Sequence, residues 1–176
     1  MTKFILHGGY TREDNEDNRN FFKEVTKDAK QILCIYFARE KSGWEESFED
    51  DKQKSNFKKL VMANEEEIER QIKEADTIWI RGGDTELLKK KLSEINFKEL
   101  IKGKTIAGSS AGVHILVKYY FSINKKCIGE GLGILNIKAF CHYTEDERGN
   151  LEKLKQHKEK LVTLVIPDYK YVVLEL

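Results

Sequence analysis

Short runs of apolar residues recur along the chain, separated by longer stretches in which charged and apolar residues alternate with helical spacing. The apolar runs predict strands at residues 3–6, 31–38, 76–80 and 104–108. The stretches between them predict helices at residues 21–30, 44–60, 64–75 and 81–92, the last after a Gly-Gly turn. Strands that alternate with helices indicate crossover units, and hence a parallel sheet with helices on both faces.

The second half of the chain continues this alternation. A glycine-rich turn at 108–112 leads into a helix expected from about Ala111 to Tyr120. An apolar stretch at 135–143, a charged helix at 147–160 and strands at 161–166 and 171–176 follow. No linker or repeat interrupts the pattern, so we expect residues 1–176 to form a single α/β domain, a three-layer α/β/α sandwich with a mainly parallel sheet.

Composition narrows the class of protein. The 176 residues carry a formal net charge of +1, which argues against an electrostatic nucleic-acid binder. The sequence has no apolar run of membrane-spanning length, and its first apolar stretch is too short for a signal peptide, so we expect no membrane association and a cytoplasmic protein. Three cysteines without a CxxC pair indicate neither a zinc site nor a disulfide framework, and we expect no metal and no cofactor.

The turn Gly108-Ser109-Ser110-Ala111-Gly112 fits the G-x-S-x-G nucleophile elbow. In this motif a tight strand-to-helix turn exposes the central serine oxygen beyond the sheet, and the next backbone N–H faces the oxygen of a bound carbonyl. The alternatives are a small-residue turn between strand and helix with no chemical role, or a turn that binds an anion without catalysing a reaction. The expected strand before the turn and helix after it favour Ser110 as a nucleophile.

A serine nucleophile needs a base, and the chain has four histidines. His114 follows Ser110 on the same expected helix and points away from it, and His157 lies in a lysine-rich helix. His7 ends the first strand beside Gly8-Gly9, where it can line a site. His142 ends an apolar strand at its carboxyl end, where ligands of open α/β sheets bind and a base could reach Ser110, so it is a candidate for the base.

Three stretches, "IWIRGGDTELL", "IAGSSAGV" and "GLGIL" followed by "CHY", together resemble the peptidase E and cyanophycinase family. The resemblance implies a serine peptidase on a class I glutamine-amidotransferase-like α/β fold. It implies Ser110 as the nucleophile, His142 as the general base, and the N–H groups of Gly83 and Ala111 as the oxyanion hole. Asp84 is expected to cap a helix rather than to react.

The chain departs from the family pattern between the elbow and the histidine, where its segment is shorter. Glu130 is our choice for the acidic member of the triad, because an acid often precedes the Leu-Gly step in these proteins. Asp146 and Asp168 remain open as alternatives. Cys141 stands where the family commonly has a proline.

By this resemblance the expected substrate is a small peptide, with a dipeptide bearing an N-terminal aspartate as the favoured class. The family's arginine-bearing segment is contracted here, and Arg148 or Arg81 would then bind the carboxylate, with His7 also lining the site. The alternative function is a catalytically silent relative that binds a small acidic ligand or a partner protein. The oligomeric state stays open, with a homodimer as one option.

Overall fold

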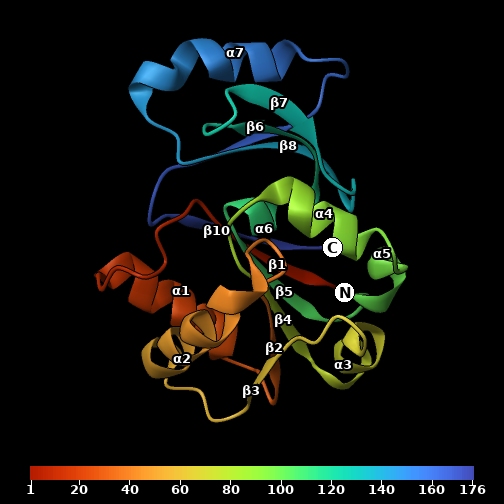
Figure 1. The fold of residues 1–176 in the computed structure, drawn as a ribbon. Coiled ribbons are helices and arrows are strands. Elements are labelled where there is room, and N and C mark those ends of the chain that lie inside the picture. The colour runs from red at the N-terminus through yellow and green to blue at the C-terminus, as the bar shows by residue number, and fades with distance from the viewer.

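The computed structural model describes residues 1–176 and contains two sheets (Figure 1). The larger sheet has the strand order β10-β1-β5-β4-β2-β3. Its strands are β1 (Lys3–His7), β2 (Ile32–Ile35), β3 (Leu60–Met62), β4 (Thr77–Ile80), β5 (Thr105–Ser109) and β10 (Tyr171–Glu175). Neighbouring strands run parallel except at one edge, where β10 pairs antiparallel with β1.

Helices cover both faces of the larger sheet. Figure 1 shows α1 (Glu16–Thr26) and α2 (Trp44–Ser55) on one side, with α3 (Ile68–Glu74), α4 (Thr85–Leu92) and α5 (Phe97–Leu100) on the other. Strands β2 and β4 are buried at every residue, as continuous apolar runs between two helical layers should be. The expected α/β class, with mostly parallel strands between helices, is confirmed.

The smaller sheet was not expected from the sequence. It has the order β7-β6-β8-β9, formed by β6 (Val117–Ser122), β7 (Cys127–Glu130), β8 (Leu135–Cys141) and β9 (Thr163–Ile166). Helix α7 (Arg148–Gln156) lies across its outer face, at the top of Figure 1. This sheet and α7 share a small apolar core of their own, made of Tyr119, Phe121, Phe140, Leu151 and Leu154.

The helix predicted from Ala111 to Tyr120 is wrong in length. Helix α6 spans only Ala111–His114, and the chain continues as β6. The residues "VKYYFS" are rich in β-branched and aromatic side chains, and their pairing with β8 and β7 buries most of them.

Other helices also have different bounds from those predicted. Helix α1 spans Glu16–Thr26 rather than residues 21–30, and α7 ends at Gln156 rather than at residue 160. Helix α2 stops at Ser55, where Asn56 adopts a left-handed conformation (φ 50°) that ends the helix before β3. Helix α3 starts at Ile68 rather than Asn64, whose side chain instead accepts a hydrogen bond from the N–H of Glu66. Short 3₁₀ turns at Lys41–Gly43 and Glu145–Glu147 precede α2 and α7. None of the helices is both long and apolar enough to cross a membrane.

The carboxyl ends of the two sheets meet at one place. Strands β1, β4 and β5 end side by side in the larger sheet, and β8 and β9 end side by side in the smaller one. The N–H of His142, after β8, donates to the carbonyl of Gly8, after β1, at 3.2 Å. Ligands of open α/β sheets bind beyond the carboxyl ends of strands, so this junction is where a site is expected.

Candidate active site

Ser110 lies in the turn between β5 and α6 with a strained backbone, φ 51° and ψ −110°. Positive φ is rare for residues other than glycine, and strained backbone conformations cluster at functional sites. The flanking glycines are required by space. A Cβ on Gly108 would lie 2.6 Å from the carbonyl oxygen of Gly112, and one on Gly112 would lie 2.2 Å from that of Ile80. The tight turn therefore presents the Ser110 hydroxyl beyond the end of the sheet.

His142 faces this hydroxyl from the smaller sheet. Its Nε2 lies 2.9 Å from Ser110 Oγ, and its Nδ1 lies 2.6 Å from Asp168 Oδ1. Because an ionised carboxylate can only accept, Nδ1 carries the proton and Nε2 is free to accept from the serine hydroxyl. Asp168 follows β9 and the single proline, Pro167. Tyr10 packs against the imidazole in a T-shaped arrangement, with ring centroids 5.3 Å apart.

Two backbone N–H groups near Ser110, those of Gly83 and Ala111, have no acceptor within the protein. Gly83 has φ 151°, and a Cβ there would lie 2.2 Å from the carbonyl oxygen of Ala38. The carbonyl of Gly82 belongs to the same peptide group as the Gly83 N–H and accepts from Arg39 Nε at 2.9 Å. Arg39 therefore holds the orientation of the peptide that carries one of the two donors.

The acid chosen from the sequence lies elsewhere. Glu130 is exposed at the end of β7, the edge strand farthest from β9, and its Oε1 pairs with Lys158 Nζ at 2.5 Å. Asp146 lies in the 3₁₀ turn before α7. Neither carboxylate contacts His142, and Asp168 does. The alternative acid Asp168, left open by the sequence, therefore takes the place we gave to Glu130.

The other histidines near the site are buried. His7 accepts from the N–H of Gly9 at Nδ1 (3.0 Å) and donates from Nε2 to Asn18 Oδ1 (2.9 Å), and burial lowers its pKa to about 4. His114 stacks on Tyr120 with centroids 4.2 Å apart, and burial lowers its pKa to about 3. His7 thus supports the Gly9–Tyr10 loop from below instead of lining the site as expected.

The two arginines expected at the site differ in placement. Arg81 is buried, with its Nε 3.0 Å from Asp51 Oδ2 and its Nη1 2.5 Å from Thr11 Oγ1. Arg148 is the first residue of α7 and lines neither cleft beside Ser110. As predicted, the Asp84 side chain caps α4, accepting from the N–H groups of Glu86 and Leu87.

Two clefts flank the serine, and both are lined by Gly83, Ser110 and His142. One extends over α4 and β6 toward Asp84 and Lys125. The other extends toward α2 and is lined also by Arg12, Arg39 and Arg81. Sequence analysis missed Arg12 and Arg39. Only their position in the sequence could have indicated that these arginines lie at the site. Each closely follows the carboxyl end of a parallel strand, β1 or β2.

A serine, a histidine and a carboxylate in one hydrogen-bonded row, beside free backbone N–H groups on an α/β fold, define the class of serine hydrolases. The family model "Peptidase family S51" matches residues 4–175. The chain therefore belongs to peptidase family S51, and it is a serine-type peptidase whose substrates are peptides. The expected kinship with peptidase E is confirmed.

Individual proteins are similar to this chain in sequence or in fold. A "Probable alpha-aspartyl dipeptidase" of Drosophila melanogaster is 25% identical over 91% of this chain and 71% of its own length. A peptidase from an acI-B1 Actinobacterium has a similar fold, with a TM-score of 0.74 at 19% identity, covering 98% of this chain and 82% of that one. A putative peptidase E protein from Listeria monocytogenes EGD-e gives a TM-score of 0.66 at 16% identity, over 100% and 99% of the two chains.

Proposed function

We propose that this protein hydrolyses small peptides, dipeptides with an N-terminal aspartate above all, with Ser110 as nucleophile, His142 as general base and Asp168 as the acid that orients it. The observation that carries this proposal is the row formed by the three side chains, at 2.9 Å and 2.6 Å. Both lengths are those of good hydrogen bonds, already formed without a substrate.

The reaction follows from this geometry. Ser110 Oγ attacks the scissile carbonyl carbon as its proton passes to His142 Nε2, and the carbonyl oxygen becomes an oxyanion. The N–H groups of Gly83 and Ala111 donate to that oxygen. His142 then returns the proton to the leaving amine as the C–N bond breaks, which leaves an ester on Ser110. A water molecule, deprotonated by the same imidazole, hydrolyses the ester and restores the serine.

Two features support a small acidic substrate. Each cleft beside Ser110 is lined by only 11 residues, which suits a peptide of a few residues. One cleft is lined by arginines and by no acid, so a substrate carboxylate would meet positive charge there. The name of the Drosophila relative points to the same substrate class for that protein.

The test combines a fluorophosphonate probe, which labels activated serines, with chromatography of Asp-Leu digests. We expect the parent protein to label and to cleave Asp-Leu, and Ser110→Ala to lose labelling and about 10³-fold or more of turnover with its fold intact. Ser109→Ala is the matched control, because it removes a neighbouring hydroxyl that contacts neither His142 nor Asp168. Loss of turnover in Ser109→Ala with activity kept in Ser110→Ala would refute the assignment.

A second variant tests the base. His142→Ala should lose turnover by a factor approaching that of Ser110→Ala, because residues of one catalytic unit have strongly non-additive effects. Normal turnover in His142→Ala would remove His142 from the mechanism. A parent protein that labels at Ser110 but cleaves Asp-Leu and Asn-Leu at equal rates would keep the serine peptidase and reject the aspartate preference.

A further inference from the structure

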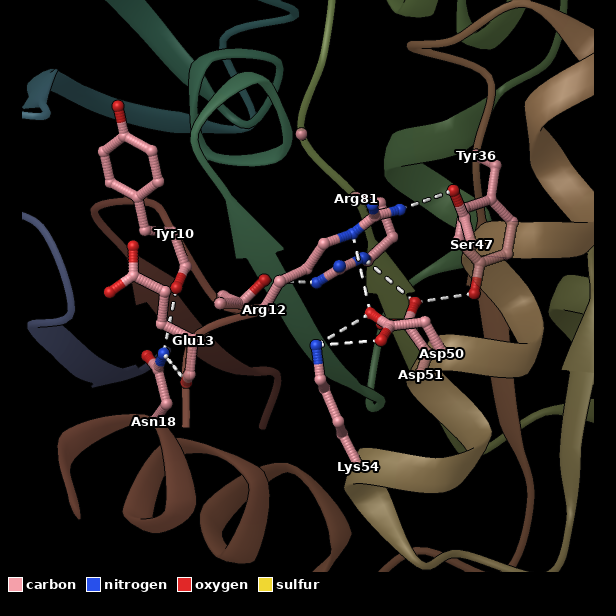
Figure 2. A network of polar contacts seen from close by, with 12 residues as sticks. Tyr10, Arg12, Glu13, Asn18, Tyr36, Ser47, Asp50, Asp51, Lys54 and Arg81 are labelled. Carbon is pink, nitrogen blue, oxygen red and sulfur yellow. Dashed lines mark hydrogen bonds and ion pairs between the residues drawn. The ribbon is translucent and has the colours of Figure 1, made fainter. Parts of the chain in front are cut away.

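The cleft beside Ser110 that extends toward α2 is lined by three arginines. Arg12, Arg39 and Arg81 line it together with His142, and no acidic residue does. Figure 2 shows this region, with Arg12 and Arg81 facing Ser47, Asp50 and Asp51 of α2. Whether the cleft attracts an anion depends on how far these two acids neutralise the arginines.

Each of these two acids already has partners within the protein. Asp51 is buried and pairs with Arg81 at 3.0 Å, and it also accepts from the Tyr36 hydroxyl at 2.7 Å. Asp50 lies nearer to Lys54 Nζ (2.8 Å) than to Arg12 Nε (3.5 Å). Arg81 is therefore neutralised within the protein, while Arg12 shares its acid with a lysine.

Arg39 has no acid at all within ion-pair distance. Its guanidinium is half-buried and donates only to neutral groups, from Nε to the Gly82 carbonyl and from Nη1 to Ser47 Oγ, both at 2.9 Å. Burial, together with the charges of Arg81 and Arg12, lowers the pKa of Arg39. A partly desolvated cation without a counter-charge is costly, and an anion bound beside it relieves that cost.

The geometry points to Arg39 and Arg12 as the residues that bind a carboxylate of the peptide substrate in this cleft. Ser47 Oγ accepts from both, from Arg12 Nη2 and Arg39 Nη1 at 2.9 Å each, so the two guanidinium groups are held side by side. Two converging guanidinium groups suit the two oxygens of one carboxylate. This inference rests on the proposed function, because the cleft shares Ser110 and His142 with the catalytic row.

The carboxylate has two sources in a dipeptide: the side chain of an N-terminal aspartate or the free C-terminus. Both present the same chemistry to the arginines. Three peptides separate them: Asp-Leu has both groups, Asn-Leu lacks the side-chain carboxylate, and Asp-Leu amide lacks the terminal one. The peptide that binds worst identifies which carboxylate occupies the cleft.

Binding is measured by isothermal titration calorimetry in the Ser110→Ala protein, so that no peptide is consumed and oxyanion stabilisation does not contribute. We expect one of the two neutral peptides, Asn-Leu or Asp-Leu amide, to bind about 10- to 100-fold more weakly than Asp-Leu, as loss of a charge-assisted hydrogen-bonded pair does. This ratio of affinities is the discrimination between the peptides. Arg39→Gln and Arg12→Gln, each made in the same background, should weaken Asp-Leu binding and shrink that discrimination to less than about threefold. Arg19→Gln is the control, because Arg19 is an exposed arginine that pairs with Asp14 and lines no part of the cleft.

These outcomes test whether Arg39 and Arg12 bind a substrate carboxylate, independently of the proposed function. Equal affinity for all three peptides, absence of binding, or unchanged discrimination in Arg39→Gln and Arg12→Gln with native circular dichroism each overturns the carboxylate assignment. Failure of the parent protein to cleave any peptide, while discrimination is present in the Ser110→Ala protein and lost in the arginine variants, would overturn the catalytic proposal and leave the carboxylate site standing.

Discussion

Gly9 offers a sharp test of the catalytic geometry, because its missing side chain is what lets His142 reach Ser110. A Cβ at Gly9 would lie 1.9 Å from Cε1 of the imidazole, whereas ordinary contact begins at 3.4 Å. In Gly9→Ala the ring must therefore retreat by about 1.5 Å, since backbone at φ 141° leaves the new methyl group little freedom to turn away.

A displacement of that size breaks the hydrogen bonds that join His142 to Ser110 and Asp168. The hydrogen bonds of His142 to Ser110 (2.9 Å) and Asp168 (2.6 Å) do not tolerate it, because hydrogen bonding ends within about 0.5 Å of these lengths. We expect Gly9→Ala to lose about 10²- to 10⁴-fold in kcat/KM on Asp-Leu, the range that a general base contributes. Strain at this glycine-only conformation should also cost about 1–3 kcal/mol of stability.

Gly103→Ala is the control that separates the effect of backbone strain from the effect of displacing His142. Gly103 also has positive φ (75°), but a Cβ there meets nothing within 4 Å, and the residue precedes β5 at the opposite end from Ser110. Gly103→Ala should lose stability and keep full activity. Assays of both variants combine Asp-Leu hydrolysis, fluorophosphonate labelling and thermal unfolding. A folded Gly9→Ala protein with kcat/KM within about threefold of the parent would refute the idea that His142 acts from its observed position.

Substitutions of Asp168, His7 and Lys138 give three further predictions. Asp168→Asn should lower kcat by about 10³- to 10⁴-fold and Glu130→Gln by less than twofold, because only Asp168 contacts His142, and the reverse order in steady-state kinetics would restore Glu130 as the acid. His7 is neutral and buried, with its pKa lowered from 6.5 to about 4, so its contribution to stability is complete above pH 6.5 and is lost as the pH falls toward 4. Urea unfolding at pH 7 and pH 4.5 measures how much the free energy of unfolding falls between these two pH values. This fall should be smaller by roughly 2–3 kcal/mol in His7→Gln than in the parent protein, and equal falls would contradict the buried neutral histidine. Lys138→Met should destabilise the protein by about 1–3 kcal/mol in urea unfolding at pH 7, because two carbonyls at the end of α7 lose their donor, and parent-like stability would contradict this.

The sequence alone was enough to predict the local elements that carry Ser110 and His142. The turn around Ser110 joins strand β5 directly to helix α6, as its glycines and small residues predicted, and His142 directly follows strand β8. These signals are local because a tight turn leaves its mark in neighbouring residues. The alternation of strands and helices likewise indicated the parallel sheet, since two parallel neighbouring strands must be joined by a crossover, which is usually a helix.

The tertiary structure decided what depends on residues far apart. Val117–Ser122 became a strand through pairing with β8 and β7, against a helical prediction that periodicity alone supported. That second sheet carries β9, and so places Asp168 at His142 across 26 residues of chain, while it turns Glu130 toward Lys158. The arginine cleft likewise joins Arg12, Arg39 and Arg81 from three strand ends. No local pattern encodes such a meeting, because side chains from separate strands become neighbours only when the strands align in a sheet.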